Sequence, residues 1–170
     1  MSCITTRSGH VSRALDFYNK SSIFFGLGKT SNWDDENNPP SPTDTEEFVE
    51  PVGYKKVESK FLVVPDNENG ELSYKSNKWK IVSPEEAIEK GAKWVYITTT
   101  ISYDELPTNI SYRQVAVFTG LEPVDSADPK SYVYRKDEVS NQGIIEVIDN
   151  RTPTYREADQ REKLVIILEF

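Results

Sequence analysis

A short glycine-rich stretch at residues 26–30, Gly-Leu-Gly-Lys-Thr, is the part of the sequence most suggestive of chemistry. Its ending resembles a phosphate-binding loop, in which backbone amides and a lysine hold the phosphates of a nucleotide. Such a loop needs a glycine five residues before the Gly-Lys pair and a helix after it. Ile23 occupies that first position, and residues 31–35 lead into prolines. The stretch is therefore predicted to be a turn, in which Gly28 supplies a positive φ and Lys29 pairs with nearby acids.

Other residue types that carry chemistry are few or poorly placed. The chain has a single cysteine, Cys3, and a single histidine, His10, which are too few ligands for a zinc site and exclude an internal disulfide. The acidic run at residues 34–36 lacks the alternating ligands of a calcium loop and is predicted to be solvated. No Gly-x-Ser-x-Gly elbow occurs. We therefore expect no catalytic residue, no metal and no cofactor.

The bulk composition narrows the class of partner. The chain has 170 residues, 36% of them apolar, and a formal net charge of −8. This charge argues against nucleic acids and anionic membranes, which both bind clustered Lys and Arg. The longest apolar run, residues 164–168, is too short to span a membrane, and no secretion signal is visible. We predict one domain over residues 1–170, made in a reducing cytosol.

Two helices are predicted from their spacing and end residues. The first covers residues 8–20, where apolar side chains recur at helical spacing after Ser8, the expected N-cap. The second is short and runs from Ser83 to Gly91, with a proline directly after its cap residue and a glycine at its end.

β-branched and aromatic residues concentrate in short segments, which predict six or seven strands. The pair Asn69 and Gly70 predicts the turn of a hairpin formed by residues 61–64 and 71–75. The expected fold is mainly β or α+β: an antiparallel β-sandwich with an N-terminal helix, one or two short peripheral helices and a long proline-rich loop. The strands include residues 22–27, 61–64, 71–75, 93–102, 113–119, 143–148 and 163–169.

Residues 29–51 form the long proline-rich loop. Three prolines, Pro39, Pro40 and Pro42, prevent a regular helix or strand there. Because loops of this length in compact domains are usually functional or disordered, and because this one carries Trp33 and Phe48, we predict an ordered, extended contact loop.

Nine tyrosines and three tryptophans are compatible with two roles. Such side chains are favoured at protein interfaces, and they also fill small β cores. Tyr54, Tyr132, Tyr134 and Tyr155 lie in polar surroundings and are the better interface candidates.

An ordered set of segments resembles a known family. Residues 15–19 read LDFYN and residues 24–33 read FFGLGKTSNW; then follow PPSPTD at 39–44, YRQVAVFT at 112–119, NRTP at 150–153 and a final strand at 163–170 that ends in Phe. In order and spacing this set resembles the baseplate wedge proteins of contractile-tailed, T4-type bacteriophages. The chain departs from the family at Asn32, where the family has a proline, and it is a short version without the family's central insertion.

The resemblance implies a structural subunit of the phage tail baseplate wedge, assembled in the host cytoplasm and acting through protein contacts without catalysis. Family members are β-sandwich subunits that pair as dimers and bind other wedge proteins. Another tail or neck adaptor, or a carbohydrate- or receptor-binding β-sandwich module, remains an alternative. The residues predicted to make contacts are Trp33, Pro39, Pro40, Pro42, Tyr54, Asn150, Arg151 and Tyr155.

Overall fold

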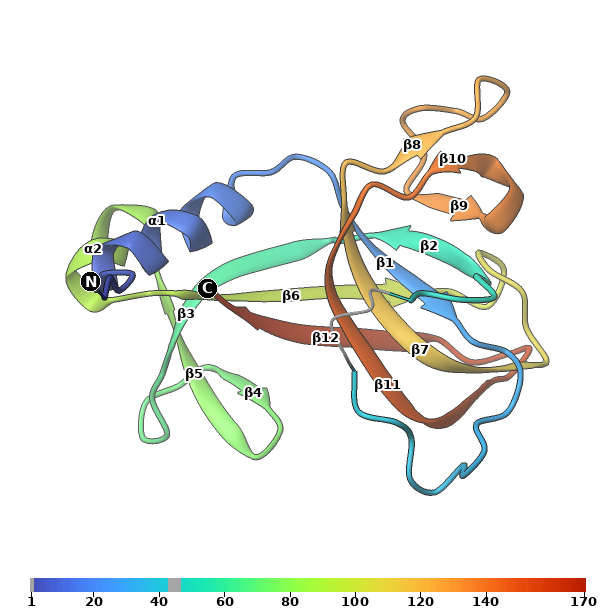
Figure 1. The fold of residues 1–170 in the computed structure, drawn as a ribbon, viewed down its shortest axis with the longest axis horizontal. Coiled ribbons are helices and arrows are strands. Elements are labelled where there is room, and N and C mark those ends of the chain that lie inside the picture. Colours follow the sequence, from blue (N-terminus) through green and yellow to red (C-terminus); the bar gives the residue numbers. More distant parts are fainter. Residues whose placement is uncertain (1, 43–46) are drawn as a thin grey trace. The chain divides into compact units, whose positions relative to one another are not determined.

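The structure, a computed structural model, describes residues 2–42 and 47–170 and consists mostly of antiparallel sheets (Figure 1). Strands make up 44% of the chain and short helices 13%, which confirms the mainly β, α+β class. The contacts divide the chain into two compact units, which are described separately. Unit 1 comprises Met1–Ser21, Glu58–Thr98 and Leu164–Phe170, and unit 2 comprises Ser22–Val57 and Thr99–Lys163. The single domain over residues 1–170 stays a prediction.

Helix α1 (Arg7–Tyr18) begins unit 1 and lies close to the predicted span. Its N-cap is Thr6, whose side-chain oxygen accepts a hydrogen bond from the Gly9 amide at 3.1 Å, so the prediction of Ser8 as the cap was wrong. The helix buries Val11, Ala14 and Phe17 and contacts strand β3 (Ser59–Pro65).

The sheet of unit 1 has the strand order β12-β6-β3-β5-β4. β3 pairs with β5 and β6, so the predicted hairpin between residues 61–64 and 71–75 was wrong. The hairpin is instead β4–β5, and its turn residues Lys75 and Ser76 have φ values of 45° and 64°. β4 has only three residues, whereas the six-residue β5 offers β3 the longer ladder. The strands are β3 (Ser59–Pro65), β4 (Leu72–Tyr74), β5 (Asn77–Val82), β6 (Trp94–Ile101) and β12 (Glu162–Glu169).

The second predicted helix is present as a 3₁₀ turn, η1 (Pro84–Glu86), followed by α2 (Ala87–Lys90). Gly91 ends it with a left-handed φ of 69°, as expected for a glycine after a helix.

Unit 2 contains the sheet β11-β7-β1-β2-β9 and the two-stranded sheet β10-β8. Another 3₁₀ turn, η2 (Lys136–Glu138), follows β9. No helix within residues 2–42 and 47–170 is long and apolar enough to cross a membrane. The strands are β1 (Ile23–Gly28), β2 (Gly53–Lys56), β7 (Ile110–Thr119), β8 (Glu122–Pro123), β9 (Val133–Arg135), β10 (Val139–Asn141) and β11 (Ile144–Arg156).

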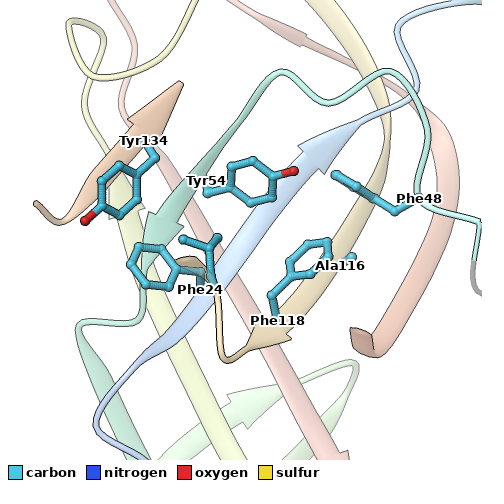
Figure 2. Close-up of a cluster of buried hydrophobic side chains, with 7 residues drawn as sticks. Phe24, Phe48, Tyr54, Ala116, Phe118 and Tyr134 are labelled. Carbon is cyan, nitrogen blue, oxygen red and sulfur yellow. The ribbon is translucent and has the colours of Figure 1, made fainter. Parts of the chain in front are cut away.

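One face of the unit 2 sheet carries an aromatic core (Figure 2). The rings of Phe48 and Tyr54 both meet Phe118 edge-on, with centroid distances of 5.0 and 5.4 Å. Gly26 makes room for them, because a Cβ there would lie only 2.5 Å from Cε2 of Phe118. Tyr54 and Tyr134 are each only 2% exposed, so their predicted role as contacts for partners was wrong; their polar neighbours in sequence concealed core positions.

Candidate protein-contact site

The guanidinium of Arg113 holds the first part of the long loop against β7. Its Nε lies 2.8 Å from Oε2 of Glu36, and its two terminal nitrogens donate to the carbonyl oxygen of Thr30 at 2.8 Å and to Oδ1 of Asn32 at 2.7 Å. Arg113 is 5% exposed, so these bonds satisfy a charge that is almost fully buried.

The ion pair shifts the titration of both partners. The hydrogen bonds from Arg113 are the main reason why the pKa of Glu36 lies below its usual value, and Glu36 in turn raises the pKa of Arg113. The prediction of a solvated acidic run was therefore wrong for Glu36; its neighbours Asp34 and Asp35 are exposed.

Trp33 attaches the same loop to β11. Its indole Nε1 donates to the carbonyl oxygen of Arg151 at 2.9 Å, and the Lys29 ammonium lies 5.2 Å from the centre of the indole ring. The indole is half-buried. A tryptophan held on both sides in this way gives the loop a fixed position.

A chain of side-chain amides continues the attachment. Nε2 of Gln114 donates to Oδ1 of Asn150 at 2.9 Å, and Nδ2 of Asn150 donates to the carbonyl oxygen of Pro40 at 3.0 Å. The Val49 amide donates to Oε1 of Gln114 at 3.1 Å, and Nε2 of Gln114 also donates to the carbonyl oxygen of Glu47 at 3.0 Å. Gln114 of β7 thus holds the loop directly at residues 47 and 49 and, through Asn150, at Pro40.

The turn after β1 differs from the prediction in one respect. The positive φ, 56°, belongs to Lys29 and not to Gly28. Gly28 is needed for a different reason: a Cβ there would lie 2.7 Å from both the Phe48 ring and the carbonyl oxygen of Val49. Nζ of Lys29 lies 2.5 Å from Oγ of Ser31 and 3.8 Å from Oε2 of Glu50.

The attached loop, residues 29–42, together with Asn150 and Arg151 forms a surface that we call the loop platform. Two surface cavities of about 410 Å³ each flank Trp33. The first is lined by Pro40, Pro42, Gln114 and Asn150 among others, and the second by residues of the loop alone. Residues 43–46, which include the Thr-Asp pair of the matched proline motif, lie outside the described residues.

The other residues predicted to make contacts or to form turns differ in their position and in the exposure of their side chains. Pro40 and Pro42 are exposed and Pro39 is half-buried. Tyr155 is 56% exposed, near the end of β11. In unit 1, Asn69 lies in a turn whose amides bond to Asp66, and Gly70 follows it where a Cβ would lie 2.5 Å from the Asp66 carbonyl oxygen. Within unit 2 the structure thus brings Trp33, the prolines and residues 150–151 together, but not Tyr54 or Tyr155.

Three residues that organise the platform were not predicted as site residues: Glu36, Arg113 and Gln114. The available signal was a charged and an amide side chain side by side in an otherwise apolar strand segment. Such residues must find partners when a strand is buried, and the nearby acidic run offered one.

Comparisons with known proteins agree with this picture. The family model of the baseplate wedge 3 tail fiber network component matches residues 2–170. "Virion protein 3" of Enterococcus phage phiEF24C is 32% identical over 175 residues, which cover 98% of this chain and 95% of that protein. These matches confirm the predicted resemblance to baseplate wedge proteins and the virion as the site of function, and they favour the baseplate over the neck. The chain therefore belongs to the family of baseplate wedge 3 tail fiber network components and is a structural component of a phage baseplate.

Proposed function

We propose that this chain is a non-enzymatic wedge subunit of a contractile tail and that its loop platform contacts a neighbouring baseplate protein. The observation that carries the second part is the attachment of the loop through Arg113 and Trp33. A loop that is already ordered loses little conformational entropy on binding, so more of the contact energy contributes to affinity. The exposed prolines are stiff, and they border the cavity beside Trp33.

The non-enzymatic role is supported by the family description, which is that of a structural baseplate component. The contractile tail and the pairing with a second copy follow from the resemblance to T4-type wedge proteins.

The platform contact is tested by adding bulk where a partner would lie. Ser41 is exposed and lines the cavity beside Trp33, so Ser41→Arg fills the cavity without removing any anchor. Incorporation of the chain into virions should fall at least about tenfold, the effect of losing about 1.4 kcal/mol of binding. Ser126→Arg, the same change at another exposed serine of unit 2, is the matched control and should leave incorporation unchanged.

Both variants should keep the melting temperature of the isolated chain, because neither side chain is buried. Normal incorporation of the Ser41→Arg chain would contradict the proposed contact. The pairing is tested separately: sedimentation velocity of the isolated chain should give a dimer, and a monomer at every accessible concentration would contradict it.

A further inference from the structure

The longest apolar run of the chain, residues 164–168, lies in the edge strand of the unit 1 sheet. This strand, β12, stands at the end of the strand order with β6 as its neighbour. No other strand within residues 2–42 and 47–170 pairs with β12, so its outer edge has no ladder partner. Such an edge presents backbone N–H and C=O groups that can pair with a strand of another chain.

One hydrogen bond shows which residues of β12 direct their backbone groups outward. The Phe170 amide donates to the carbonyl oxygen of Lys93, directly before β6, at 3.0 Å. Successive residues of a strand direct their backbone groups to opposite sides, so the even-numbered residues of the run face β6 as Phe170 does. Val165 and Ile167 therefore direct their N–H and C=O groups to the outer edge.

The burial of the side chains and a second contact agree with this alternation. The even-numbered residues of the run are buried, whereas Val165 and Ile167 are half-buried. The carbonyl oxygen of Leu164 accepts a hydrogen bond from Oγ1 of Thr98 in β6 at 2.9 Å. The run is therefore a regular strand with one packed and one unpaired edge.

The other sheet edges of the described residues are protected against pairing, and β12 is not. The edge strands β4 and β9 have only three residues each. β11 has two register shifts and contains Pro153, and the carbonyl oxygen of its Arg151 is occupied by the indole of Trp33. β12 has eight residues, no proline, and no charge between Lys163 and Glu169. Short length, bulges, prolines and charges are the usual devices that prevent edge pairing, and an apolar edge without them is expected to pair.

We propose that two copies of this chain pair along β12, antiparallel and about a two-fold axis at Ile166. The proposal rests on the pairing with a second copy proposed above and names its interface. In this register Val165 of one copy lies opposite Ile167 of the other. Both residues direct their backbone groups outward, so each such pair exchanges two N–H···O bonds. Their β-branched side chains lie on the same face of the joined sheet and contact each other across the strands.

A second copy is the occupant that this edge fits, because one strand can supply both sides of the contact. Pairing closes the open edge of both copies at once, and the two-fold symmetry stops assembly at a dimer. The register also avoids like charges, because Lys163 of one copy lies opposite Glu169 of the other. Glu169 already contacts Lys93 at 2.5 Å, so the affinity is expected to come from the backbone ladder and the apolar pairs.

Cysteine pairs test the register directly in a Cys3→Ser chain, which has no native thiol. Val165→Cys in one copy and Ile167→Cys in the other come to lie about 5.5 Å apart between Cα atoms, within disulfide range. Two Val165→Cys chains, or two Ile167→Cys chains, place their cysteines diagonally at about 7–8 Å, which is too far. An oxidised mixture of the two chains should therefore give at least about tenfold more linked dimer than either chain alone. Ile88→Cys, at a 51% exposed position of α2, is the control and should give no linked dimer above the level of the single chains.

Sedimentation velocity of the same chains separates the two proposals. A dimer whose mixture gives no more linked product than the separate chains would overturn pairing along β12 but leave pairing with a second copy intact. A monomer at every accessible concentration would contradict both.

A proline tests whether the backbone of β12 carries the contact. Val165→Pro removes an outward N–H that has no ladder partner in a single chain, and proline is tolerated at such edge positions. The dissociation constant of the dimer should rise at least about tenfold, because the symmetric contact loses two hydrogen bonds. Val165→Thr keeps the N–H and the β-branched shape and should change the dissociation constant less than about threefold. Equal dissociation constants for the two variants would overturn the role of the edge, and the cysteine mixture decides the proposal if the proline variant does not fold.

Discussion

The loop of residues 29–42 in unit 2 and the β4–β5 hairpin in unit 1 are held in place by different kinds of interaction. The loop has no regular secondary structure, yet the buried Arg113, Trp33 and the amide of Asn150 tie it to strands β7 and β11. The hairpin has a regular backbone ladder, but its side chains are largely exposed and its turn places two non-glycine residues at positive φ.

The difference indicates that hydrogen bonds donated by side chains can fix the position of a segment that has no regular backbone ladder. In the loop, one guanidinium satisfies a carboxylate, an amide oxygen and a main-chain carbonyl. In the hairpin, the indole N–H of Trp79 has no acceptor among the described residues. Each region therefore leaves one buried donor without an acceptor among the described residues, Nε of Arg151 beside the loop and Nε1 of Trp79 in the hairpin.

The largest expected effect comes from Arg113→Ala. It leaves Glu36 and Asn32 without their partner, but the Glu36 side chain is 30% exposed and Asn32 is exposed, so water replaces part of what they lose. Removing the almost fully buried Arg113 side chain together with its hydrogen bonds should lower the free energy of unfolding by about 2 kcal/mol. Urea unfolding measures the change in the free energy of unfolding.

The control for this prediction is Lys80→Ala, which removes an exposed cation from β5 in the hairpin. Its expected effect is below about 0.5 kcal/mol. Comparable losses for the two variants would contradict the view that the loop depends on a buried cation.

The same substitution at two tryptophans compares the regions directly. Trp33→Phe removes a hydrogen bond to the Arg151 carbonyl oxygen and should lower the free energy of unfolding by about 1 kcal/mol beyond any packing loss. Trp79→Phe removes a donor that makes no bond, so it lacks this loss. Thermal or urea unfolding measures both, and a loss at Trp79 that exceeds the packing lost with its indole would show that the indole N–H has a partner in the free chain.

Much of the fold followed from local pattern. The two helices were predicted because capping residues and helical spacing are short-range signals, and the mainly β class followed from β-branched and aromatic segments. The pairing of β3 with β5 was missed, because the Asn69-Gly70 pair suggested a turn and the turn that closes the hairpin, Lys75-Ser76, has no glycine. Strand pairing depends on distant partners that turn residues alone do not specify.

The platform was predicted only in part. Trp33, the prolines and residues 150–151 were chosen from family resemblance and residue type, and the structure brings them together. Tyr54 was placed at the surface because its neighbours in sequence are polar, although it points into the core in Figure 2. Arg113 and Glu36 are 77 residues apart, and no local pattern connects them.

A smaller effect should come from placing glycine at a position with positive φ in each region, Ser76 in the hairpin and Lys29 in the loop. Ser76→Gly relieves a left-handed φ of 64° in the hairpin turn and should stabilise the chain by about 0.5 kcal/mol, once the higher entropy of glycine in the unfolded state is included. Lys29→Gly relieves a φ of 56° but also removes the contacts to Ser31, Glu50 and Trp33, so it should not stabilise. Equal stabilisation by both, measured by thermal unfolding, would mean that these contacts add nothing.

The smallest effect is local and depends on pH. The pKa of Glu36 is lowered in the folded chain, mainly by the hydrogen bonds from Arg113, so its carboxylate stabilises the loop fully above the ordinary pKa near 4.5, and this contribution is lost as the pH falls through the lowered value. Because the Trp33 amide lies 3.4 Å from Oε2 of Glu36, its ¹⁵N–¹H resonance should shift in this acid range. Glu36→Gln cannot titrate and should abolish that part of the shift, and the Trp79 amide in the hairpin should not follow it. A transition of the Trp33 amide above pH 4.5, or one that persists in the glutamine variant, would mean that another group holds the loop.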